Sequence, residues 1–189
     1  MGVILTGCSS SSEPAPDVSA TAGASASATA SAEVLPSPTS TLSAEEQQAF
    51  EEATAVVLAY RQTITDLYSG ARTNLNDLND VATGDLVDQG LTSIQQSLNE
   101  GWSSEPVGAQ ITLFSAEPTQ LDLNGDPPTM VVEACIDTSD VVDVSPDGVR
   151  DMGTRERAEY SVTRTDYLPA PGWAVSEVSG AERPEDRLC

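Results

Sequence analysis

Apolar residues between Phe50 and Leu67 recur at steps of three and four, which places them on one face of an α-helix. Ser43 and Glu46 fit a capping box ahead of this run, in which each side chain accepts a hydrogen bond from the other residue's amide. Gly70 follows the last apolar residues, where glycine commonly ends a helix. The pattern therefore predicts a helix that begins after Ser43 and ends near Gly70.

Two further apolar sets have helical spacing. Leu75, Leu78 and Val81 precede Thr83-Gly84-Asp85, where we expect a new helix cap. Leu91, Ile94, Leu98 and Trp102 form the next set, which predicts a helix that stops around Gly101. The aromatic side chains of these segments either belong to the core, the commoner role on an apolar stripe, or line a pocket; they are Tyr60, Tyr68 and Trp102.

After Pro106 the period of the pattern changes to two, which is typical of strands with one buried face. Four strands are predicted, around residues 110–113, 130–136, 155–166 and 173–178. Turn sequences separate them at 124–125, 146–148 and 169–172. Helices followed by such a meander predict an α+β domain, with N-terminal helices packed on a curved, cone-like, four-stranded antiparallel sheet.

The segment before these elements has a different composition. Residues 9–41 are nearly all Ser, Ala, Thr, Pro, Glu and Val, without an aromatic or basic side chain. Such a segment cannot bury enough apolar surface to offset its ordering entropy. We therefore expect a disordered tether over residues 9–43 and a single folded domain over residues 44–189.

The start of the chain carries an export signal. Leu5-Thr6-Gly7-Cys8 resembles the lipobox of bacterial lipoproteins, in which the cysteine receives a diacylglyceryl thioether and fatty acids such as palmitate. A complete signal peptide also has a basic start and an apolar stretch of about 7–15 residues. We expect residues 1–8 to be a signal-peptide remnant with its lipobox, and Cys8 to anchor the protein on the extracellular side of the cell membrane. The alternative is a disordered terminus with a free thiol.

The charge balance excludes one class of partner. Thirty acidic residues against eight arginines give a formal net charge of −22, and the chain has no lysine. Nucleic-acid binding depends on basic side chains that neutralise phosphates, so we expect no nucleic-acid partner. Electrostatic attraction to anionic lipid is disfavoured for the same reason. The acidity is more simply explained by solubility than by an acidic docking surface.

The order of elements resembles a known group of proteins. Helices, a curled sheet, the strand Val131-Val132-Glu133-Ala134-Cys135-Ile136-Asp137, the segment Gly172-Trp173-Ala174-Val175 and a terminal Cys189 are similar to exported lipoproteins of high-GC bacteria. These have a domain like nuclear transport factor two, also called cystatin-like. The resemblance covers about residues 44–189 and implies a fold and an envelope location, but no reaction.

The cysteines agree with an exported protein. With Cys8 assigned to lipid, Cys135 and Cys189 remain as a pair in a compartment that permits disulfides. A bridge between them would stabilise the domain by about 4 kcal/mol in the chain-entropy model. The alternative is a buried free thiol at Cys135 and an unpaired Cys189.

Candidate catalytic and metal-binding residues are few. The chain has no histidine, which excludes Ser-His-Asp and Cys-His catalytic sets and histidine-ligated zinc. Asp122, Asn124, Asp126 and Glu133 match positions of a calcium loop, but Pro127 stands where that loop requires glycine, which favours a hairpin turn. The acidic group Asp137, Asp140, Asp143 and Asp147 is interpreted as a solvated loop. We predict no catalytic residue, metal or cofactor.

Two functional hypotheses follow. The first is a lipid-anchored cell-surface protein with a non-catalytic domain that binds an unknown envelope protein or a small apolar ligand in its cone. The alternative is a small cavity enzyme of the acid–base isomerase or dehydratase type, with Tyr60, Tyr68, Tyr160 and carboxylates as candidate groups. A cone filled by side chains favours the first hypothesis, and an open pocket with a buried Asp and Tyr favours the second.

Overall fold

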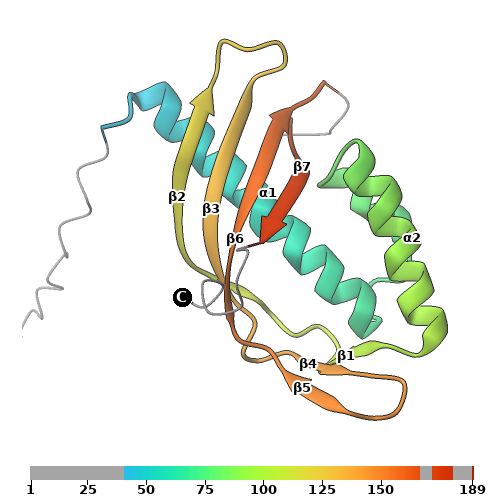
Figure 1. The fold of residues 1–189 in the computed structure, drawn as a ribbon. Helices are drawn as coiled ribbons and strands as arrows, with labels where there is room; N and C mark the ends of the chain where they lie inside the picture. Colours follow the sequence, from blue (N-terminus) through green and yellow to red (C-terminus); the bar gives the residue numbers. More distant parts are fainter. Residues whose placement is uncertain (1–40, 167–171, 181–188) are drawn as a thin grey trace, which may run out of the picture. The chain divides into compact units, whose positions relative to one another are not determined.

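The computed structural model describes residues 41–166, 172–180 and Cys189, which belong to a compact unit that begins at Ser40. Helices come first and a mainly antiparallel sheet follows (Figure 1), so the predicted α+β class is confirmed. Cys8 and the predicted tether up to residue 40 lie outside the described residues.

The first helix, α1 (Ala44–Ser69), has the predicted limits. Its capping box is complete: the Ser43 amide donates to Glu46 Oε2 at 2.7 Å, and the Glu46 amide donates to Ser43 Oγ at 3.3 Å. Gly70 ends the helix at φ 76°, in the left-handed region that glycine tolerates best. Within the described ranges, none of the helices is long and apolar enough to cross a membrane.

The other two helical segments differ in type. Residues Leu75–Asp80 form a short 3-10 helix, η1, whose Leu78 is buried. Helix α2 (Asp85–Glu100) starts after Gly84 and ends at Gly101, as predicted. The six-residue η1 holds only two of the three apolar residues, Leu75 and Leu78, and Val81 follows as its C-cap, so the segment is too short for an α-helical stripe.

The four predicted strands form one sheet, although the first begins at Thr112 and runs to Asp122 rather than over the predicted residues 110–113. They are β2 (Thr112–Asp122), β3 (Thr129–Asp137), β6 (Arg155–Arg164) and β7 (Trp173–Gly180), antiparallel and in the order β2-β3-β6-β7. Helix α1 crosses one face of this sheet, and the sheet curves around the helix (Figure 1). The segment that matches positions of a calcium loop contains the turn between β2 and β3, as its sequence Asn124-Gly125 predicts.

The core lies between α1 and this sheet. Every second residue of β3 faces it, and Met130, Val132, Ala134 and Ile136 are each almost fully buried. Trp173 at the start of β7 is also buried, and its Nε1 donates to Glu52 Oε2 of α1 at 3.2 Å. This bond satisfies the indole N–H, which is costly to bury without a partner.

A second, smaller sheet was not predicted. Its strands are β1 (Ser103–Glu105), β4 (Val142–Val144) and β5 (Arg150–Met152), antiparallel in the order β1-β4-β5. The turn predicted at 146–148 connects β4 to β5. Three-residue strands are too short for an alternation that repeats over several residues, so the period that revealed the large sheet is weak here.

The predicted disulfide is confirmed. Cys135 and Cys189 are bonded, with their Cα atoms 6.1 Å apart and 54 positions apart in sequence. Cys135 alternates with the core residues Ala134 and Ile136, so it lies on the face of β3 that points away from α1. It is nevertheless only 2% exposed.

Candidate functional site

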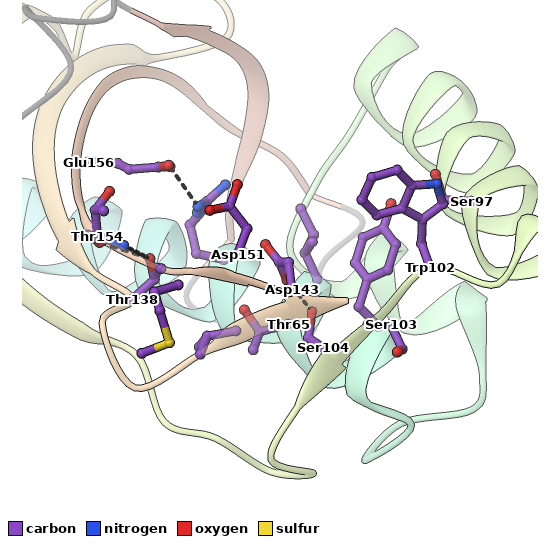
Figure 2. A pocket seen from close by; sticks show the side chains of 16 residues that line it. Thr65, Ser97, Trp102, Ser103, Ser104, Thr138, Asp143, Asp151, Thr154 and Glu156 are labelled. Atoms are coloured by element: carbon purple, nitrogen blue, oxygen red, sulfur yellow. Dashed lines mark hydrogen bonds and ion pairs between the residues drawn. The ribbon is translucent and has the colours of Figure 1, made fainter. Parts of the chain in front are cut away.

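A cavity of about 490 Å³ lies between the C-terminal half of α1 and the small sheet (Figure 2). This volume falls within the range of about 300–1,000 Å³ that is usual for ligand pockets. Helix α1 contributes Arg61, Ile64, Thr65 and Tyr68. These residues are spaced by three, four and seven positions, which is why one face of the helix presents all four.

The small sheet supplies a row of polar side chains. Ser104 of β1 is in register with Asp143 of β4, and Asp143 is in register with Asp151 of β5. All three line the cavity (Figure 2). Ser104 is buried, and its Oγ donates to Asp143 Oδ1 at 2.6 Å, so one aspartate of the row is held by a hydrogen bond.

Among the described residues, the single basic side chain on the cavity wall is already paired. Arg61 Nη2 lies 3.4 Å from Glu156 Oε2. Arg150, the neighbour of Asp151 in sequence, instead donates to Glu105 at 2.6 Å. In the described part of the chain neither Asp143 nor Asp151 forms an ion pair.

Apolar groups complete the wall. Tyr68 and Trp102 bring aromatic rings, and Val141 and Met152 bring aliphatic surface. Trp102 is 41% exposed and Met152 is 63% exposed, so water reaches the rim of the cavity. The site therefore combines carboxylates with accessible aromatic and aliphatic groups.

The predicted aromatic trio is divided by the fold. Tyr68 and Trp102 line the cavity, whereas Tyr60 is a buried core residue. Tyr160 is likewise buried in the core, and burial raises the pKa of both Tyr60 and Tyr160. Of the three tyrosines considered for acid–base chemistry, only Tyr68 is placed to meet a ligand in this cavity.

The interior of the cone is occupied by side chains from both layers. Val57 and Tyr60 of α1 belong to the same buried cluster as Val132, Tyr160 and Val162 of the sheet. Among the described residues the buried polar side chains are Thr63, Ser69 and Ser104, so no aspartate is buried there. The arrangement that would favour an acid–base enzyme, a buried Asp that converges with a Tyr, is not found in this part of the chain.

Asp122 and Glu133, in the segment that matches positions of a calcium loop, each have a local partner. Asp122 accepts a hydrogen bond from the Asn124 amide at 3.1 Å, and Glu133 lies 3.6 Å from Arg157, so this segment is built as a turn and a strand. Within the described ranges, no group of three or more His, Cys, Asp or Glu side chains could hold a metal ion.

The fold places the members of the second acidic group in different elements; they are Asp137, Asp140, Asp143 and Asp147. Asp137 pairs with Arg155 at 2.8 Å, Asp143 lies in β4, and Asp147 accepts a hydrogen bond from the Ser145 hydroxyl in the turn that follows. The interpretation of this group as a loop was therefore wrong for Asp137, the last residue of β3, and for Asp143 in β4, although the Asp143 side chain is exposed to solvent.

Sequence reasoning missed the residues that the small sheet brings to the cavity. A signal was present: Val142 and Val144 flank Asp143, and a Pro-Asp-Gly turn follows at 146–148. Alternation on one side of such a turn is typical of a short hairpin. The pairing with β1, which completes the row, depends on a contact between residues 39 positions apart and could not be inferred locally.

No protein-family model matches this chain, and no curated protein matches its sequence. Among the solved structures that match this chain, two show weak similarity. The intermembrane-space region of the chloroplast protein ARC6 has 18% identity and a TM-score of 0.42, with 68% of this chain and 92% of that chain covered. The periplasmic domain of DotI has 16% identity and a TM-score of 0.41, with 76% of this chain and 100% of that chain covered. These values are too low for a function to be transferred from either protein.

Proposed function

We propose that this protein is a non-catalytic interaction module of the bacterial cell envelope, anchored by lipid at Cys8 to the extracellular side of the cell membrane. Its domain binds a protein partner through the small sheet and the cavity behind it. The location of the exposed apolar side chains carries this proposal.

Four of the five large apolar side chains that are exposed in the described residues belong to the small sheet or adjoin it in sequence; they are Trp102, Val107, Val149 and Met152. Single exposed apolar residues are ordinary, but their concentration around one element is typical of an interaction surface. The fifth, Phe114, lies under the guanidinium of Arg155, 4.2 Å from the ring centroid, and so has an intramolecular partner.

A protein partner fits this surface better than a small apolar ligand in the cone. The cone is filled by the buried cluster, and the cavity has carboxylates on its wall. A purely apolar ligand would desolvate these carboxylates without compensation. The disulfide supports an exported location, because such bonds persist in oxidising compartments.

The absence of catalysis is part of the proposal. Where a carboxyl group has a shifted pKa, hydrogen bonds lower it, as they do for Glu46, Asp137 and Asp147. A catalytic acid needs the opposite shift at neutral pH. The lipobox and the resemblance to lipoproteins with a domain like nuclear transport factor two remain predictions from the sequence.

A photo-crosslinking experiment in cells tests the proposal. A benzophenone amino acid replaces Met152, and in a matched strain it replaces Phe114, which is 57% exposed on the large sheet. We expect a discrete crosslinked protein from position 152 and none from position 114. Equal crosslinking at both positions, or none at 152, would contradict the proposed surface.

A further inference from the structure

We infer that the cavity receives a positively charged side chain, an arginine or a lysine, from the partner polypeptide. The inference rests on the proposed function and specifies the chemistry of the same site. Three observations carry it: the pair of aspartates, for which no described residue is an ion-pair partner, the aromatic and aliphatic walls, and the exposed apolar side chains in and near the small sheet.

Two aspartates of the small sheet line the cavity. Asp143 and Asp151 are opposite each other on neighbouring strands, and like charges in this position destabilise a sheet. A comparable row, Glu117, Glu133 and Glu159, crosses the large sheet, but there Arg157 lies 3.6 Å from Glu133. At the cavity, no described residue forms an ion pair with Asp143 or Asp151, both of which are exposed, and Arg61 on the same wall is paired with Glu156. The compensating charge is therefore left for a ligand to bring.

The walls suit the whole length of a basic side chain. A methylene stem can pack against Ile64, Val141 and Met152, while its charged head reaches the aspartates. The rings of Tyr68 and Trp102 can attract a cation through their faces. Arg61, paired with Glu156 on the same wall, is an internal example of a guanidinium held there by a carboxylate.

The exposed apolar side chains favour a polypeptide over a free small cation. Met152 lines the cavity, and Val107 and Val149 are near β1 and β5 in sequence; all three are more than half exposed, and a small cation in the cavity would leave them uncovered. A second copy of this chain is disfavoured, because each copy has a net charge of −22. Anionic lipid is repelled for the same reason.

The test uses the full chain labelled with 5-fluorotryptophan. The protein has two tryptophans: Trp102 is on the cavity wall, and Trp173 is 1% exposed in the core. Their two ¹⁹F resonances therefore provide a reporter and an internal control in one sample. The probes are a short capped peptide with an arginine between leucines, and the same peptide with neutral citrulline in place of arginine.

We expect the arginine peptide to shift the Trp102 resonance saturably and to leave the Trp173 resonance in place. The citrulline peptide should bind about tenfold more weakly, because it cannot neutralise the aspartates. The double variant Asp143→Asn/Asp151→Asn should lose this preference. A charge-matched control, Glu117→Gln/Glu177→Gln, changes two exposed carboxylates outside the cavity and should keep it.

Equal binding of the two peptides, or an equal loss of preference in the control variant, would overturn the inference. Crosslinking separates this failure from failure of the proposed function. A partner that crosslinks at position 152 equally well with and without Asp143→Asn/Asp151→Asn would refute the role of the charge and leave the binding surface standing. No crosslink in either background would contradict the proposed function itself.

Discussion

Asp143 and Asp151 face each other across strands β4 and β5 on the wall of the cavity. Ser104 donates a hydrogen bond to Asp143, and this bond leaves the charge repulsion between the two aspartates in place. We therefore expect the pair to lower the stability of the domain at its candidate binding site. Such a compromise is common where function requires groups that the fold alone would avoid.

Removal of one charge should stabilise the domain. For Asp151→Asn we expect the free energy of unfolding to rise by about 0.2–1 kcal/mol, the usual scale of a cross-strand pair. Urea unfolding at low ionic strength measures it, and added salt should reduce the difference because it screens the repulsion. Glu177→Gln, an exposed change outside the cavity, should stay within about 0.5 kcal/mol of the parent. A destabilised Asp151→Asn variant would argue that the pair is not repulsive.

Replacement of Gln62 should lower the free energy of unfolding more than replacement of a glutamine on the surface. Its side chain donates to the Ala109 carbonyl at 2.9 Å and accepts from the Ile111 amide at 3.1 Å, which fixes the segment between β1 and β2 to α1. Gln62→Ala leaves both backbone groups without these partners and should cost about 1–3 kcal/mol in urea unfolding. Gln96→Ala, in the exposed part of α2, should cost less than about 0.5 kcal/mol. Similar costs for the two variants would refute this role.

Reduction of the disulfide should destabilise the domain. The bond between Cys135 and Cys189 spans 54 positions, which corresponds to about 4 kcal/mol in the chain-entropy model. For a domain of this size, thermal unfolding under reducing conditions should occur about 10 °C lower. Cys189→Ser should reproduce the reduced wild type, because Cys189 is exposed and its replacement leaves no cavity. An unchanged melting temperature in both would show that the bond adds no stability.

Asp137 should make stability depend on pH in the acid range. Hydrogen bonds from Ser139, together with one from the Arg155 guanidinium, lower the pKa of Asp137 from 3.8 to about 2. The folded state thus holds the proton less tightly than the unfolded state. The resulting stabilisation is complete above the ordinary pKa and is lost as pH falls through 3.8 towards 2. Asp137→Asn should flatten this part of the curve of unfolding free energy against pH, and an unchanged curve would contradict this role of Asp137.

The anchor can be tested independently of the fold. If Cys8 carries lipid, Cys8→Ala expressed behind a complete signal peptide should move the protein from the membrane fraction to the medium. Cys189→Ala, which removes a cysteine from the disulfide instead, should leave the membrane fraction unchanged. Retention of the Cys8→Ala protein in the membrane would exclude the lipid anchor.

The sequence by itself determined the large elements of this protein. The limits of α1 follow from Ser43 and Gly70, and the alternation of β3 follows from its apolar residues, because caps and periodicity act over only a few residues. The disulfide could also be predicted, since one cysteine pair remained once Cys8 was assigned to lipid.

Tertiary structure alone decided the cavity. Its row of Ser104, Asp143 and Asp151 requires three short strands to pair, two of them joined by a local turn and the third brought from 39 positions away. Tyr60 and Tyr68 are eight positions apart on one helix, yet one is buried against the large sheet and the other faces the cavity. The physical reason is that α1 extends past the large sheet, so its packing partner changes along its length while its sequence pattern does not.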